Sequence, residues 1–247
     1  FYTIQKNIME IFGIRAVMEA ITSSKDIDKV FIQIGLKGSL INTLESIIRK
    51  NKINFSYVPK QKLDRLSKKN HQGVIARISP IKLLNLNEID SIITENDAPI
   101  ILILDQINDV RNFGAIIRTA EVAGVTAVVI QNSSSAPINS DTIKTSAGAI
   151  FNIPICKVNH IKDAIYHFKS LGISIISASE KSDKNLYDTD FKKPVAIVMG
   201  SENKGINKSV LKISDEIVKL PMYGKIESLN VSVASGIFLY EVIRQRI

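Results

Sequence analysis

Three polar segments of this chain contain glycine and carry the residue types best suited to binding and catalysis. The first spans residues 108–121, where Asn112 is predicted to cap a helix and Gly114 lets a ligand approach the backbone closely. Arg118 follows Gly114 by one helical turn on the same side, where its guanidinium could hold a phosphate. The alternative for Arg118 is an ion pair with Glu121 on an exposed helix face.

The second segment spans residues 198–206 and is typical of a strand that runs into a turn. Gly200 and Gly205 are the residues expected where a ligand lies against bare backbone, and Glu202 places a carboxylate at the end of the strand. A strand followed by a glycine-rich turn is common in α/β folds, so this segment alone does not define a function.

The third segment spans residues 220–236 and leads into the last helix. Ser228 is predicted to be the N-cap of that helix, and Asn230 and Ser232 add amide and hydroxyl groups near its positive end. These groups could bind an anion or a polar ligand. The alternative is that they only cap the helix.

The elements that position these segments alternate between strand and helix. Residues 100–104 form a continuous apolar run, as expected for a parallel strand covered on both faces. A helix at 112–123, ended by Gly124, and a strand at 127–130 complete a βαβ unit. The pattern predicts a parallel α/β sheet with a binding crevice at the carboxyl ends of its strands. Further strands are expected at 153–158, 173–177, 195–199 and 216–220, and helices at 140–147, 161–170, 208–213 and 231–246.

The chain is predicted to hold two domains: residues 1–80 form a small α/β domain, residues 81–97 a linker with room for one helix, and residues 98–247 the larger domain. With 247 residues, 45% of them hydrophobic and 23% charged, the chain has the composition of a globular protein and not of a fibrous or disordered one. The ordered pattern starts near residue 11, so residues 1–8 could be foreign to the natural chain, with Met9 as its start; that they are native is the equal alternative. In the first domain we expect helices at 11–21, 40–49 and 63–69 and strands at 30–34, 53–58 and 73–78.

The positive charge lies entirely in the first third of the chain. The formal net charge is +8, and residues 1–80 hold 14 Lys and Arg against 6 Asp and Glu, whereas the remainder is balanced. Cations interleaved with Phe55 and Tyr57 predict RNA binding, because cations bind phosphates and aromatic rings stack on unpaired bases. The alternative is a solvated basic face with both rings in a strand core. The expected RNA-binding residues here are Arg49, Lys50, Lys52, Lys60, Lys62, Arg65, Lys68 and Lys69.

Several other classes of function are excluded or disfavoured. The chain contains neither G-x-G-x-x-G after a strand nor G-x-x-x-x-G-K-[ST], which disfavours a dinucleotide fold and a P-loop NTPase. The histidines, His71, His160 and His167, lack ligand spacing, so no metal is expected and each is predicted to lie at a surface or interface. Cys156 is the single cysteine; we expect a small buried hydrophobe in a cytoplasmic protein. No apolar run approaches the roughly 18 residues of a membrane span.

The three segments together resemble the three motifs of the SpoU, or TrmH, family of RNA ribose 2′-O-methyltransferases, which belong to the SPOUT class. The sequences that carry the resemblance are NFGAIIRTAEVAG, VMGSENKG and LPMYGKIESLNVSVASG, in the family's order and spacing. Upstream, residues 11–17 and 71–76 are similar to the two ends of the family's small RNA-binding domain. This domain favours the members that methylate a guanosine ribose of large-subunit (23S) rRNA.

The resemblance implies a C-terminal domain tied in a deep trefoil knot, a homodimer, and S-adenosylmethionine as methyl donor. The matching cofactor positions are Met199, Gly200, Leu220, Leu229 and Asn230. The positions matched to catalysis and to the substrate phosphate are Asn112, Arg118, Glu202, Ser228 and Asn230, with Arg111 expected to contact RNA. Two positions depart from the family's pattern: Arg111 stands where many relatives have His, and Phe113 stands where Leu is common.

The implied reaction requires a group that removes the ribose 2′ proton. Arg118 is the family's suggested base, but a guanidinium stays protonated in proteins. The assignment therefore stays open between Arg118 and Glu202. Two other functions also stay open: a tRNA ribose 2′-O-methyltransferase, and a noncatalytic RNA-binding ribosome-assembly factor with this fold.

Overall fold

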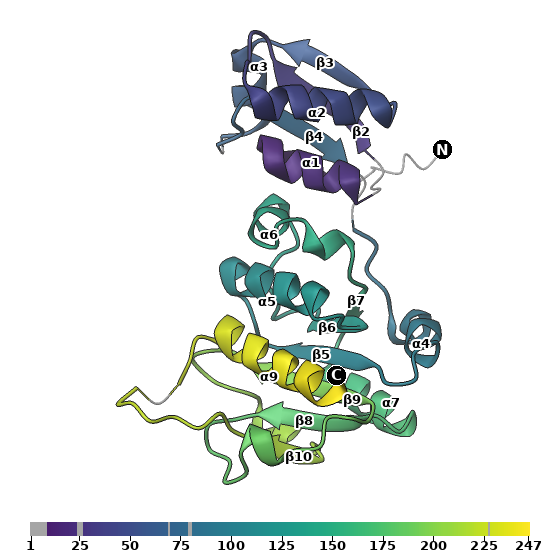
Figure 1. The fold of residues 1–247 in the computed structure, drawn as a ribbon, viewed down its shortest axis with the longest axis vertical. Coiled ribbons are helices and arrows are strands. Elements are labelled where there is room, and N and C mark those ends of the chain that lie inside the picture. Colours follow the sequence, from purple (N-terminus) through teal and green to yellow (C-terminus); the bar gives the residue numbers. More distant parts are fainter. Residues whose placement is uncertain (1–8, 24–26, 69, 79–80, 227) are drawn as a thin grey trace. The chain divides into compact units, whose positions relative to one another are not determined.

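The computed structural model describes residues 9–23, 27–68, 70–78, 81–226 and 228–247 (Figure 1). The chain divides into two compact units, one of residues 1–81 with 138–152 and the other of residues 82–137 with 153–247. This division differs from the predicted one at residues 138–152, which group with the first unit. It differs also at residues 82–97, which belong to the second unit.

The first unit contains a four-stranded mixed sheet in the order β1-β4-β2-β3. Strand β4 pairs antiparallel with both β1 and β2, whereas β2 and β3 are parallel. The sequence prediction missed β1, because it assigned the apolar residues from Ile11 onward to a helix. That helix begins only after Gly13, whose φ of +95° turns the chain. The strands are β1 (Met9–Phe12), β2 (Ile27–Gln33), β3 (Phe55–Val58) and β4 (Val74–Ile78).

Helices cover both faces of this sheet. Successive strand residues point to opposite sides, so neighbouring residues of one strand are buried on different faces. Phe31 on β2 packs with Ile75 on β4 and with Leu63 of α3. Its neighbours Val30 and Ile32 are fully buried on the opposite face. The helices of this unit are α1 (Ile14–Thr22), α2 (Ser39–Lys50), α3 (Lys60–Leu66), α6 (Ser140–Thr145) and the 3₁₀ turn η1 (Ala149–Phe151).

The second unit is built on a six-stranded sheet in the order β10-β8-β9-β5-β6-β7, and all of its strand pairs are parallel. The predicted parallel α/β sheet is confirmed. Every residue of β5 is buried, as its continuous apolar run predicts for a strand covered on both faces. The strands are β5 (Ile100–Asp105), β6 (Ala127–Gln131), β7 (Ile155–Val158), β8 (Ser174–Ala178), β9 (Val195–Gly200) and β10 (Glu216–Val218).

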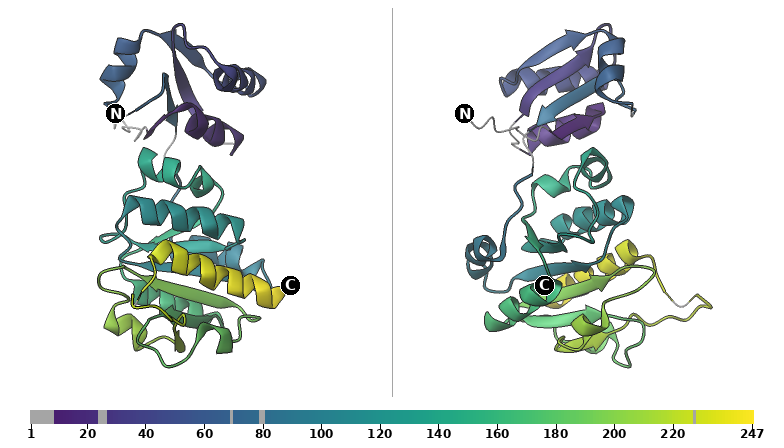
Figure 2. Two further views of the ribbon diagram at one scale, coloured as in Figure 1. Left: turned by 60° about the vertical axis from the view of Figure 1, so that its left-hand side comes forward. Right: turned by 180° about the vertical axis from the view of Figure 1, so that it is seen from behind.

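Helices α5 and α9 lie side by side on one face of this sheet (Figure 2). The other face buries Phe168 of α7 and Val210 of α8 against β5 and β9. The predicted linker forms part of this layer, because Ile89 and Ile93 of α4 are buried in the same core. The helices are α4 (Leu86–Thr94), α5 (Val110–Val122), α7 (Ile161–Ser170), α8 (Lys208–Leu211), α9 (Val231–Arg246) and the 3₁₀ turn η2 (Leu186–Asp188). Within the described residues, no helix has the length and hydrophobicity needed to cross a membrane.

Candidate active site

The three segments singled out in the sequence meet at the side chain of Asn230. Its Nδ2 donates to Oδ1 of Asn112 at 3.0 Å and also donates to Oε1 of Glu202. Its Oδ1 accepts from the backbone N–H of Ser232 at 2.9 Å. We call Asn112, Glu202 and Asn230 the polar cluster. It joins the start of α5, the turn after β9 and the start of α9, which lie far apart in the sequence.

The start of α5 differs from the prediction that Asn112 caps this helix. Asp109 is the N-cap, and its Oδ1 accepts from the backbone N–H groups of Arg111 at 2.9 Å and Asn112 at 2.8 Å. Asp109 and Asn112 are both of residue types that cap helices well, and it is Asp109 that satisfies the free N–H groups of the first turn of α5. The side chain of Asn112 is consequently available to the polar cluster.

The start of α9 also differs from the prediction, because Asn230 and not Ser228 is the N-cap. The Asn230 oxygen accepts from the N–H groups of Ser232 and Val233, which are the second and third residues of the helix. Ser228 is exposed and lies two residues before the cap. The two interpretations of this segment, helix capping and ligand binding, therefore both apply to Asn230. Its side-chain oxygen caps α9, and its side-chain nitrogen belongs to the polar cluster.

A tight turn after β9 presents Glu202. The N–H of Gly205 donates to the carbonyl of Ser201 at 2.8 Å, and Gly205 has a φ of +64°. A Cβ on Gly200 would lie 2.2 Å from the carbonyl carbon of Gly205 and 2.3 Å from the nitrogen of Ile206. Glycine at position 200 is therefore required for the close packing of this turn, which leaves Glu202 exposed at its tip.

A cavity of about 260 Å³ lies beside this turn, among the loops that follow β8, β9 and β10. Met199 and Phe238 give it buried apolar surface. Its charged lining residues are Glu180, Lys181, Glu202, Lys204 and Lys219. The predicted cofactor residues that line it are Met199, Gly200, Leu220 and Leu229, and the predicted catalytic residues that line it are Glu202 and Ser228. Asn230 is outside the lining and directly precedes Val231, which is part of it.

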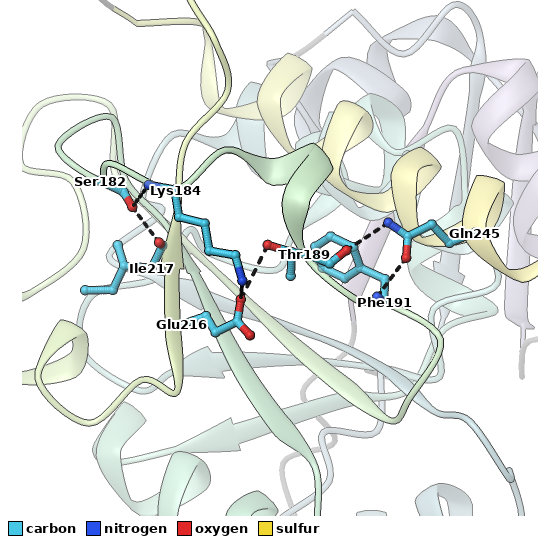
Figure 3. Close-up of polar contacts among 7 residues, drawn as sticks. All are labelled: Ser182, Lys184, Thr189, Phe191, Glu216, Ile217 and Gln245. Carbon is cyan, nitrogen blue, oxygen red and sulfur yellow. Dashed lines mark hydrogen bonds and ion pairs between the residues drawn. The ribbon is translucent and has the colours of Figure 1, made fainter.

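The sequence analysis missed the segment 179–181, which follows β8 and forms another part of the cavity wall. It could have been found by applying to β8 the rule that loops at the carboxyl ends of parallel strands bind ligands. Two contacts fasten the chain that continues from it, as Figure 3 shows: Ser182 Oγ donates to the carbonyl of Ile217, and Lys184 Nζ donates to Oε2 of Glu216, each at 2.5 Å. This wall is thereby tied to β10.

The comparisons with known proteins match two successive segments of the chain. Residues 99–240 match the SpoU rRNA Methylase family, and residues 11–84 match the RNA 2′-O ribose methyltransferase substrate binding domain. The chain is 35% identical to the 23S rRNA (guanosine-2′-O-)-methyltransferase RlmB of Vibrio vulnificus, over 96% of this chain and 97% of that protein. The chain belongs to the SpoU family.

Solved structures of SpoU proteins share its fold. The structure of AviRb from Streptomyces viridochromogenes in complex with AdoMet has a TM-score of 0.82 at 21% identity, over 97% of this chain and 90% of that one. The A. aeolicus TrmH/SpoU tRNA modifying enzyme has a TM-score of 0.56 at 31% identity, over 65% of this chain and 82% of that one.

Arg118, the arginine of the first SpoU motif, lies on α5 and is exposed. Among the described residues, no hydrogen bond joins its guanidinium to the polar cluster. Arg111 is also exposed, in the first turn of the same helix. The structure thus brings together Asn112, Glu202 and Asn230 but leaves both arginines facing solvent, where a charged substrate can reach them.

Asp105 is a buried residue that supports the Glu202 turn and was not among the predicted site residues. It ends β5 opposite Gly200 of β9, is only 2% exposed, and accepts from the N–H of Asn207 at 2.8 Å. Burial raises the pKa of its carboxyl group, against the opposing effect of hydrogen bonds from Asn207 and from the Gln106 side chain. Asp105 therefore ties the exit of the Glu202 turn to the sheet. A carboxylate directly after an apolar strand was the available signal.

The predicted RNA-binding cations lie in the first unit, within the segment that matches the SpoU-type substrate-binding domain. Seven of the eight are exposed, on α2, on α3 or directly after these helices, and the eighth, Lys69, falls outside the described residues. The Arg49 guanidinium lies 5.6 Å from the ring centre of Phe55. The reading that puts both aromatic rings in a strand core is wrong for Tyr57, which is 47% exposed and donates from its hydroxyl to Oε1 of Glu45 at 2.8 Å.

The histidines do not all lie at the surface of this SpoU protein. His71 is buried, and its Nδ1 accepts from the N–H of Gly73 at 3.0 Å, so its Nε2 carries the proton that faces Asp64 at 2.9 Å. The surface prediction is wrong for His71 because this pair of contacts satisfies the ring inside the fold. Across the part of the chain that the structure describes, no group of three or more His, Cys, Asp or Glu residues could hold a metal ion.

Proposed function

We propose that this chain is an S-adenosylmethionine-dependent RNA methyltransferase that methylates the ribose 2′-OH of a guanosine in 23S rRNA. The observation that carries the proposal is the polar cluster of Asn112, Glu202 and Asn230, which stands beside the cavity at the ends of β8, β9 and β10. The RlmB relative of 35% identity, which is aligned over both the methylase and the substrate-binding segments, supports the choice of substrate.

The cavity fits S-adenosylmethionine in its chemistry. Met199 and Phe238 offer apolar surface to a nucleoside. The lining carries charges of both signs, with Glu180 and Glu202 to complement a cationic sulfonium and Lys181, Lys204 and Lys219 to complement the carboxylate of the methionine part. Gly200, Leu220 and Leu229 would complete the binding site. When bound, this cofactor supplies a methyl group on a good leaving group, so positioning of the acceptor accounts for much of the acceleration.

Glu202 is our choice for the group that receives the proton of the 2′ hydroxyl. Asparagine amides are not bases, and a guanidinium stays protonated, so the carboxylate is the proton acceptor of the polar cluster. Asn230 holds Oε1 of Glu202 and Oδ1 of Asn112 with the same nitrogen, which fixes both acceptors relative to each other. Arg118 and Arg111 bind substrate phosphates, and Ser228 contacts the substrate at the mouth of the cavity.

The test is to incubate the protein with methyl-labelled S-adenosylmethionine and, separately, unmodified 23S rRNA and unmodified total tRNA. Label at one ribose of 23S rRNA, found by its resistance to alkaline cleavage, is the expected result. Label in tRNA alone would overturn the substrate, and the A. aeolicus tRNA modifying relative gives that alternative its support. Cofactor binding without label in either RNA would favour the noncatalytic assembly factor, for which the polar cluster has no use.

Arg118→Lys tests the role of the guanidinium. The variant keeps the charge but loses the planar fork that binds a phosphate through two hydrogen bonds. We expect a severe loss of turnover with cofactor affinity largely kept. Turnover close to that of the unsubstituted protein would contradict the assignment.

The proposal includes the finer architecture expected of the family: a deep trefoil knot in the methyltransferase domain of residues 98–247, an RNA-binding domain of residues 1–80, a homodimer, and a cytoplasmic location where rRNA is made. Exposed apolar side chains of α9, Val233 and Tyr240, support a dimer contact. Sedimentation at several protein concentrations tests the dimer, since a mass that stays at 27.3 kDa would contradict it.

A further inference from the structure

A second cavity of about 320 Å³ opens on the other side of the Glu202 turn. It shares Ser201, Asn203 and Lys204 with the cavity assigned to the cofactor. Its other walls are the loops that follow β5 and β6, the two neighbouring strands of the sheet. The two cavities are therefore separated only by the turn that carries Glu202.

The residues that line this second cavity all have polar side chains. The lining consists of serine, asparagine and glutamine side chains with a single cation, Lys204. A site for a bare phosphate would be expected to offer more positive charge, whereas amides both donate and accept hydrogen bonds, as the edge of a nucleobase does. The lining therefore fits a base with one adjoining phosphate.

The backbone at Gln106 supports a functional role for this cavity. Gln106 follows β5 directly and has a φ of +61°, which is uncommon for a residue other than glycine. Backbone of this kind gathers at binding sites, where the surrounding structure holds it in place. Here it turns the chain so that Gln106 and Asn108 both line the cavity.

We infer that this second cavity binds the base of the nucleotide whose ribose is methylated, and that Asn108 and Asn203 recognise the guanine by hydrogen bonds. The inference rests on the proposed function. A base on one side of the turn and the cofactor on the other would bring the ribose between them to Glu202. Lys204 would bind the phosphate next to this nucleotide.

The experiment uses the full chain and a synthetic RNA fragment that spans the ribose labelled in the assay above, with guanosine or inosine at that position. Inosine lacks the 2-amino group of guanosine, so it removes one hydrogen bond from the recognised edge. The variant is Asn108→Ala with Asn203→Ala, and the matched control is Asn96→Ala, an exposed asparagine near the opposite end of β5.

We expect the double variant to raise KM for the guanosine fragment at least tenfold and to lose most of the preference for guanosine over inosine. Asn108→Ala alone, at a residue that lines only the second cavity, should raise KM while it keeps cofactor affinity within twofold. The control should change none of these. An unchanged KM and an unchanged preference in the double variant would overturn the inference. The rate of methyl transfer by the unsubstituted protein tests the proposed function. The KM of the double variant, divided by that of the unsubstituted protein, tests this inference, so a failure of one can be told from a failure of the other.

Discussion

The side-chain nitrogen of Asn230 donates to the side-chain oxygen of Asn112 at 3.0 Å, although 118 positions separate the two residues in the chain. The orientation of the Asn230 amide follows from the helix that it caps, because its oxygen must face the free N–H groups of α9. The nitrogen therefore has to point away from the helix, toward Asn112 and Glu202. The same side chain begins α9 and positions the acceptors of the site.

Asn230→Ser separates these two roles. Serine is as good an N-cap as asparagine but has no second donor, so the variant should keep its free energy of unfolding within about 0.5 kcal/mol. We expect its turnover to fall by roughly a hundredfold, because Glu202 and Asn112 lose their common donor. Asn230→Ala should lose the same turnover and also about 1 kcal/mol of stability. Urea denaturation and the methyl-transfer assay measure the two effects, and a serine variant with full turnover would contradict the positioning role.

Gly200→Ala should damage both folding and cofactor binding. The new Cβ would meet the backbone of Gly205 and Ile206 at distances that no side-chain movement can relieve. We expect a loss of about 1–3 kcal/mol in stability, typical of overpacking, together with loss of cofactor affinity. Gly224→Ala is the matched control, since a Cβ there meets no heavy atom within 4 Å. Thermal denaturation and calorimetric titration measure the outcome, and equal behaviour of the two variants would refute the assigned packing.

The sequence predicted the second unit well because the strands of a parallel sheet covered on both faces are continuous apolar runs, as at residues 100–104. It failed for β1, since Met9–Phe12 is a strand only by pairing with β4. The range 231–246 predicted for the last helix is that of α9, but the N-cap was misassigned for both α5 and α9. Asp109 and Asn112, like Ser228 and Asn230, are all good caps, and local preference cannot choose between them.

The candidate site shows the same limit. Sequence motifs named Asn112, Glu202 and Asn230 but could not join them, because their hydrogen bonds depend on the order of the strands. Asp105 could have been noticed as a carboxylate at the end of an apolar strand, but nothing in the adjacent sequence shows that Asn207 will donate to it. What the sequence predicts is therefore the set of chemical groups, and what the fold adds is which of them meet.

Asp105→Asn should alter how stability depends on pH. Burial raises the pKa of this carboxyl above its ordinary value of 3.8, so the native state holds the proton more tightly than the unfolded chain. Its contribution to stability is present below 3.8 and is lost as the pH rises through the native pKa. Asparagine cannot ionise, so the stability of the variant relative to the unsubstituted protein should improve with rising pH. Urea denaturation at about pH 4 and about pH 7 measures this difference, and equal differences at the two pH values would contradict the prediction.

Cys156 should resist alkylation while the protein is folded. It is fully buried on β7 in the core that includes Ile89 and Ile93 of α4, which agrees with the sequence prediction of a small buried hydrophobe. Burial is the main cause that raises the pKa of its thiol to about 12. Iodoacetamide at about pH 8 should therefore label the protein only after urea is added, since the thiolate is the reactive form. Rapid labelling without urea would show that α4 opens away from the sheet.

The exposed cations of α3 should contribute to RNA affinity through phosphate contacts. Lys60→Ala with Arg65→Ala removes two of them, and we expect this double variant to bind 23S rRNA more weakly. The slope of the logarithm of the binding constant against the logarithm of the salt concentration should become less steep by about 1 for each lost phosphate contact. The control is Lys192→Ala with Lys193→Ala, which removes equal charge from exposed positions of the second unit. Filter binding at several salt concentrations measures both slopes. If the two double variants lose affinity equally, the binding reflects net charge alone and the first unit has no special part in holding the RNA.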